Sequence, residues 1–334
     1  MLYIKTFLIG LAGAFVFQLL HLPVPWLLGS LTTVFIVQLF TSCSFKWSVR
    51  LRDIGLIVVG LSLGSFFTVG LVHDMLYYLP MMLVLNAILL VVSVMLAFFT
   101  AKWCGIDFQT ALVSSIPGGF SQLVIFAEDK KMLNLPVITY FHVVRVLLVV
   151  TLVPLIFHQE AVELSITQAS NLFFVGLLCI AGYAAMLFAR FLRIPVPAFL
   201  GPLIFVVVLS FLPMQSVQMS PTFLHVAQIF IGCHIGLSLK KKDLALSKRI
   251  LATGILSALV LIGFTFITTN MFLFYRTEAS FQTAFLSLAP GGLDQMSLIA
   301  LGVGGDVAVV TLFQLFRILV IYLCVLPLLQ KGIK

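Results

Sequence analysis

The chain has 334 residues, of which 62% are hydrophobic and 9% are charged, and its mean hydropathy is +1.21. A soluble domain is about a quarter charged, so this composition excludes a soluble protein and indicates an integral membrane protein. The net charge of +8 gathers in short loops, as at Lys240–Lys242, which is typical of the cytoplasmic face of a membrane and not of a nucleic-acid-binding surface.

Twelve apolar elements follow one another in chain order, and their lengths predict an all-α protein. In the first half we expect helices at 4–20, 25–41, 53–71 and 77–100, a broken element at 108–127 and a helix at 133–156. In the second half we expect helices at 170–190, 197–212, 222–239 and 249–273, a broken element at 281–301 and a helix at 306–329.

The two halves are copies of each other. LPVPWLLG, which begins at Leu22, returns as IPVPAFLG from Ile194, at an offset of 172 residues (195 minus 23). The small-residue pairs Gly60/Gly64 and Gly232/Gly236 recur at the same offset and predict close helix contacts. The chain therefore reads as two repeats, 1–158 and 166–334, within one membrane domain.

The two broken elements carry the strongest repeated motif. FQTALVSSIPGGFSQ begins at Phe108, and FQTAFLSLAPGGLDQ begins at Phe281. Proline removes a backbone donor and glycine accepts angles that a helix does not use, so a helix cannot pass straight through either copy. Paired breaks of this kind point to a transporter's binding site, although simple kinks for helix packing are the alternative. The predicted site includes the residues of both breaks, Pro117, Gly118, Gly119, Pro290, Gly291 and Gly292.

Loop charges predict how the repeats are oriented. The loop after the second helix holds Lys46, Arg50 and Arg52, whereas its counterpart at 213–221 has no Lys or Arg. Equivalent loops then lie on opposite faces, which favours inverted repeats of about five crossing helices plus one broken or re-entrant element each. The same rule places both termini in the cytoplasm and the protein in a bacterial inner membrane.

Polar residues just beyond the breaks complete the predicted site: Ser121 and Gln122 in the first copy, Asp294 and Gln295 in the second. A carboxylate at membrane depth is costly and is usually functional. Asp294 could bind a cation, take up a proton or pair with an arginine.

Arg145 and Arg317 occupy equivalent positions in the last helix of each half. Arginine suits bidentate contacts with carboxylate or phosphate, so an anionic substrate is one interpretation. The other is internal pairing with Asp294, Asp306 or Glu128. His142, one turn before Arg145, is either a proton relay or a packed, hydrogen-bonded residue. Asn134 and Asp306 are interpreted as N-caps of the final helices.

Taken together, the proline-rich entries, the Pro-Gly-Gly segments and the arginine-bearing helix (GGDVAVVTLFQLFR) resemble the bacterial AbrB-duplication membrane proteins. The resemblance covers nearly the whole chain. Members of that family carry the labels regulator of gene expression and ammonia monooxygenase. The architecture is also similar, by analogy, to inverted-repeat secondary transporters, but fold analogy does not fix function.

These observations favour a secondary active transporter of a small, anionic solute, coupled to protons or sodium, and not an enzyme. The alternative is a membrane-embedded regulator without transport, and a monooxygenase is less expected because the histidines and cysteines lack metal-ligand spacing. We expect no cofactor and no metal. The expected partners are the solute, the coupling ion, the lipid bilayer and a second copy in a homodimer, but no nucleic acid.

Overall fold

The computed structural model describes residues 2–41, 44–67, 69–119, 123–124, 126–127, 132–157, 172–210, 219–238, 245–275 and 279–332. Every regular element in these ranges is helical, which confirms the prediction of an all-α membrane protein. Within the described residues, 5 helices are long and apolar enough to cross a membrane: Leu2–Leu19, Tyr78–Cys104, Leu135–Ile156, Lys248–Phe274 and Val307–Gln330. Other apolar helices, such as Pro25–Phe40 and Pro197–Ser210, are shorter.

The chain forms two compact units, and each takes helices from both sequence halves. The first unit comprises Met1–Tyr77, His158–Ser238 and Leu301–Ala308. The second comprises Tyr78–Phe157, Leu239–Ala300 and Val309–Lys334. The first three elements of each half therefore belong to one unit, and the last three belong largely to the other.

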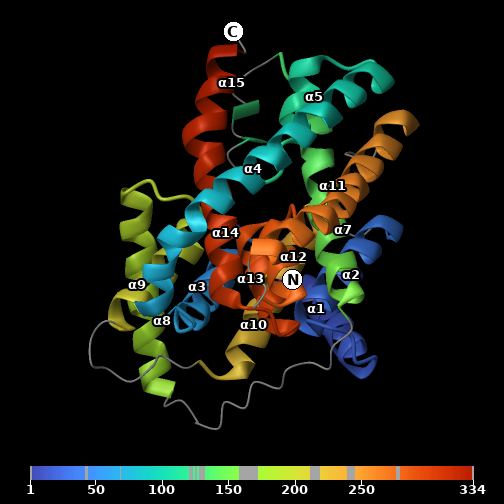
Figure 1. Ribbon diagram of the computed structural model, residues 1–334. Coiled ribbons are helices and arrows are strands. Elements are labelled where there is room, and N and C mark those ends of the chain that lie inside the picture. The colour runs from blue at the N-terminus through green and yellow to red at the C-terminus, as the bar shows by residue number, and fades with distance from the viewer. Residues whose placement is uncertain are drawn as a thin grey trace. The chain divides into compact units, whose positions relative to one another are not determined.

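The first unit is a symmetric bundle of six helices: α1 (Leu2–Leu19), α2 (Pro25–Phe40), α3 (Val49–Gly64), α8 (Leu172–Phe191), α9 (Pro197–Ser210) and α10 (Pro221–Gly236). α1 packs on α2 and α8 on α9, while α3 packs on α9 and α10 on α2 (Figure 1). Each half thus lays its third helix on the second helix of the other half, as expected for two repeats related by a two-fold axis. α3 begins earlier than predicted because the side chain of Ser48 accepts a hydrogen bond from the Arg50 amide and caps the helix.

Glycines permit the crosswise contacts, and they do so in matching pairs. A Cβ atom built on Gly64 of α3 would lie 2.9 Å from the carbonyl oxygen of Leu203, so no side chain fits there. Built on Gly236 of α10, it would lie 2.6 Å from the carbonyl oxygen of Leu31, the residue equivalent to Leu203. The predicted close helix contacts are therefore confirmed.

The twin Pro-Val-Pro segments hold a second symmetric feature. Val24 and Val196 have φ angles of 48° and 47°, in the left-handed region, directly before the prolines that begin α2 and α9. A β-branched residue in this region is strained by about 1–3 kcal/mol. Both repeats pay this cost at the same position, which supports a structural role for these segments in turning the chain into its second helix.

The second unit contains the broken elements. Its helices are α4 (Val69–Cys104) from Tyr78 onward, α5 (Phe108–Ser115), α7 (Leu135–Ile156), α11 (Lys248–Tyr275), α12 (Phe281–Leu288), α13 (Leu293–Gly302), α14 (Val307–Val320), η2 (Ile321–Val325) and α15 (Leu326–Gly332). α14, the π-helical turn η2 and α15 continue as one rod (Figure 1). Its apolar core joins Val113 and Ile116 of the first broken element to Ile138 of α7 and to Ile321 and Leu329 of that rod. The last element of the chain therefore supports the first break.

Candidate functional site

Each broken element begins with a well-capped half-helix. The side chain of Asp107 accepts hydrogen bonds from the amides of Gln109 and Thr110 at the start of α5. Ser280 accepts one from the Thr283 amide at the start of α12. These caps satisfy amides that have no partner within a helix. They fix the register in which the repeated Phe-Gln-Thr-Ala segment enters the site.

Both half-helices end where the sequence predicts. α5 ends at Ser115 and α12 at Leu288, and the next residues, Ile116 and Ala289, turn to extended conformations. The physical reason is the following proline, which disfavours helical angles in the residue before it. α13 then begins at Leu293, so the second element is two separate helices. The carbonyl groups at the C-terminal ends of α5 and α12 are left without helical partners.

Arg317 fills this gap in the second repeat. Its Nη1 donates to the carbonyl oxygens of Leu288 (3.2 Å) and Ala289 (2.9 Å), and its Nη2 donates to that of Gly291 (3.0 Å). The same Nη2 also donates to the side-chain oxygen of Gln314. The guanidinium group therefore caps the C-terminal end of α12, where a positive charge is favourable.

Gln314 extends this cap by one turn. Its Nε2 donates to the carbonyl oxygens of Leu286 (2.7 Å) and Ala289 (3.1 Å), and its oxygen receives the Arg317 proton. The sequence was silent on Gln314 as a site residue. Its alignment with His142, at the 172-residue offset, was the available signal.

The first repeat repeats the arrangement with different side chains. His142 contacts the carbonyl oxygen of Val113 through Nε2 (3.0 Å), and its Nδ1 lies 2.8 Å from Nη2 of Arg145. Arg145 Nη1 donates to the carbonyl oxygen of Ser115 at 3.5 Å. With Nε2 as donor and Nδ1 as acceptor, a neutral His142 satisfies both contacts. His142 is thus a packed, hydrogen-bonded residue in this structure, equivalent to Gln314.

The two breaks meet at Arg317. A Cβ atom built on Gly118 would lie 3.4 Å from Arg317 Nε and 3.2 Å from Ile321 Cδ1. The same arginine that caps the second half-helix therefore touches the first break. Arg145 and Arg317 are also near enough to interact as like charges, and each is 4% exposed. The site thus concentrates two buried cations.

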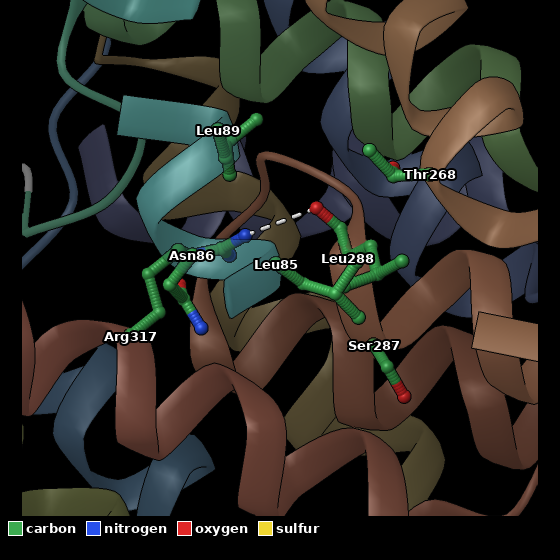
Figure 2. Close-up of a pocket in the computed structure, with 7 residues that line it drawn as sticks. All are labelled: Leu85, Asn86, Leu89, Thr268, Ser287, Leu288 and Arg317. Carbon is green, nitrogen blue, oxygen red and sulfur yellow. Dashed lines mark hydrogen bonds between the residues drawn. The ribbon is translucent and has the colours of Figure 1, made fainter. Parts of the chain in front are cut away.

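A cavity opens beside Arg317 within the second unit. It is lined by Leu85, Asn86, Leu89, Thr268, Ser287, Leu288 and Arg317 (Figure 2). The residues come from α4, α11, α12 and α14, so all four elements surround it. Asn86 and Thr268 were not predicted as site residues. A single amide within the apolar run 79–99 was a signal for Asn86, but nothing local marked Thr268.

One nitrogen of each arginine has no hydrogen-bond partner among the described residues. These atoms are Arg145 Nε and Arg317 Nε, both buried. An unpaired buried donor is costly, so such atoms often mark the place of a ligand or an ordered water. Within the described residues, the one salt bridge joins Arg52 to Asp53 of α3, away from either guanidinium group.

The charges around the breaks do not balance. Two guanidinium groups face the C-terminal ends of two half-helices, each equivalent to about half a negative charge, and the N-terminus of α13 adds about half a positive charge. With the Asp294 carboxylate counted, about half a positive charge remains among the described groups. Without Asp294, about one and a half remain. The described part of the site therefore favours an anion.

The remaining predicted residues take several positions. Asp294 stands partly exposed in the first turn of α13 and accepts a hydrogen bond from Nε2 of Gln295 at 2.8 Å. The side-chain oxygen of Gln295 is buried without a partner among the described residues. Asn134 and Asp306 accept hydrogen bonds from the amides of Val137 and Ala308, which confirms their predicted capping role. Ser121, Gln122 and Glu128 lie outside the described residues. No group of three or more His, Cys, Asp or Glu suited to a metal ion occurs in the described ranges.

Comparisons with known proteins agree on one family. The AbrB family, described as Transition state regulatory protein AbrB, matches residues 26–332. The "Uncharacterized protein YhjN" of Bacillus subtilis strain 168 is 25% identical, over 94% of this chain and 88% of that protein. The "Putative regulator AbrB" of Escherichia coli K12 is 27% identical, over 73% of this chain and 72% of that protein. No solved structure matches the chain.

Proposed function

The chain belongs to the AbrB family of membrane proteins, and from that premise we propose that it transports a small anion through the crossing of its two broken elements. The observation that carries the proposal is Arg317, a buried guanidinium group that caps one break, touches the other and lines a cavity. Broken helices whose free backbone groups surround a solute are a recurring device of secondary transporters.

The excess of positive charge supports an anion as the solute. A buried charge without compensation is expensive, and a bound anion would offset it. Proton or sodium coupling belongs to the same proposal, with Asp294 in the first turn of α13 as the acidic group nearest to the second break in sequence.

A regulator without transport is the second candidate function. It is favoured by the printed name of the Escherichia coli relative and by the family description. Such a protein would act through its loops and would need no solute flux. A metabolite carried by a transporter could also produce a regulatory effect indirectly.

Transport by the purified protein separates these two functions. We expect proteoliposomes to accumulate a labelled anion from a mixed panel of carboxylates, phosphate and chloride when a proton or sodium gradient is imposed. Arg317→Gln should slow uptake at least about tenfold, because each factor of ten needs only about 1.4 kcal/mol of lost interaction. Arg190→Gln, at an exposed position near the end of α8, is the matched control and should transport normally. Absence of anion uptake in the wild type, or normal uptake by Arg317→Gln, would refute the proposal.

A further inference from the structure

The cavity beside Arg317 offers few hydrogen-bond donors. All four Nη protons of Arg317 are engaged, by the carbonyl oxygens of Leu288, Ala289 and Gly291 and by Gln314. The guanidinium group therefore keeps one donor, the buried Nε–H, which has no partner among the described residues.

Asn86 supplies at most one further donor. Its Nδ2 donates to the carbonyl oxygen of Met82 at 2.8 Å and retains a second proton. The hydroxyl groups of Thr268 and Ser287 donate to the carbonyl oxygens of Thr265 (3.0 Å) and Thr283 (2.7 Å). Since a hydroxyl has a single proton, neither can donate to a ligand in this arrangement. Two N–H groups are enough for one carboxylate, whereas phosphate and sulfate need more.

The charge of the site sets the same limit. With between about half and one and a half positive charges in excess, a monovalent anion brings the site close to neutrality. A divalent anion would leave a net negative charge buried, which is unfavourable.

The rest of the cavity wall is largely apolar. Leu85, Leu89 and Leu288 line it together with the methyl-bearing side chain of Thr268 (Figure 2). Such a wall suits a hydrocarbon group and gives nothing to the second charged end of a dicarboxylate. The cavity is small, so the hydrocarbon part must be short.

Resting on the proposed function, we propose that the transported anion is a short-chain aliphatic monocarboxylate. Its carboxylate would accept from Arg317 Nε and Asn86 Nδ2, and its alkyl group would pack against Leu85, Leu89 and Leu288. The specificity would come from a short count of donors on one side and leucines on the other.

Binding by the purified wild-type protein tests this directly. In a chloride-free buffer, acetate, propionate, butyrate, succinate, phosphate and chloride are compared by calorimetric titration. We expect propionate to bind about fourfold more tightly than acetate, the factor for one buried methylene. Succinate, phosphate and chloride should bind at least about tenfold more weakly than propionate, for lack of donors, of a matching charge or of a hydrocarbon part.

Two variants with a matched control sharpen the test. Leu85→Ala should shift the preference by about one methylene, toward butyrate. Asn86→Leu should weaken every carboxylate about tenfold. Leu83→Ala, on the same helix but 52% exposed, is the control and should bind like the wild type.

The outcomes separate this inference from the proposed function. If phosphate, succinate or chloride binds best, or if chain length has no effect, the inference is wrong. Loss of that binding in Arg317→Gln would then still support an anion site. If no anion binds, or if Arg317→Gln binds like the wild type, both the inference and the proposed function are refuted.

Discussion

The two Pro-Gly-Gly breaks have the same sequence at their centre but different surroundings. At the second break, Arg317 donates to three carbonyl oxygens and to Gln314. At the first, Arg145 donates to a single carbonyl oxygen, at 3.5 Å, and contacts His142. The duplicated arginines thus keep one role, the capping of a half-helix, but only the second break has the extensive cap. The difference shows how one repeat can specialise for structure and ligand contact while the other retains a simpler form.

The backbones of the breaks differ as well. Gly118 and Gly119 have φ angles of 108° and 64°, which favour glycine. Gly291 and Gly292 are not among the glycines with positive φ. The first pair is therefore needed for its backbone conformation, and the second pair for space.

Removal of the arginines should give the largest difference between the breaks. Arg317→Met leaves three carbonyl oxygens and Gln314 without their donor, and each unsatisfied buried group costs about 1–3 kcal/mol. Arg145→Met removes fewer contacts, so we expect it to lose about half as much stability. The free energies of unfolding of the purified variants are compared in detergent, with Arg190→Met as the exposed control. Equal losses at both positions would contradict the asymmetry.

Alanine at the glycines should give a smaller difference. Gly118→Ala places a side chain at a positive φ, 3.2 Å from Ile321, and should cost about 1–3 kcal/mol. At Gly291 the new Cβ atom would meet the terminal atoms of Met296, 2.6 Å from Cε, and that flexible side chain can move away. We therefore expect Gly291→Ala to cost less than about 1 kcal/mol. Thermal unfolding of the two variants, with the wild type, measures this order, and the reverse order would show that the backbone difference has no energetic consequence.

Exchange of His142 and Gln314 should give the smallest effect. His142→Gln puts into the first repeat the side chain that the second already uses to join a half-helix carbonyl to its arginine. We expect the variant to fold with a change of less than about 1 kcal/mol, and Gln314→His to behave similarly. His142→Leu and Gln314→Leu are the controls that remove the contacts, and each should cost about 1–3 kcal/mol. If His142→Gln were as damaging as His142→Leu, the two positions would not be equivalent.

Local patterns in the chain were sufficient for much of the fold. Long apolar runs predicted a helical membrane protein, and the offset of 172 residues predicted the matching glycine contacts of α3 and α10. The half-helix ends at Ser115 and Leu288 were predictable because proline acts on the residue before it. These properties depend on neighbours in sequence, which is why composition and spacing reveal them.

The partners of the arginines were decided by the tertiary structure. From the sequence, Arg145 and Arg317 could face a substrate or a carboxylate, and their role as caps of distant half-helices was not considered. Arg317 reaches Gly118 across about two hundred residues of chain, and Asn86 and Thr268 join the cavity from separate helices. No periodicity encodes such contacts, because they depend on how helices far apart in the chain pack against each other. The sequence by itself determined that two broken elements exist. The packing of α4, α7, α11 and α14 around them decided which charged groups meet there and which donors remain for a ligand.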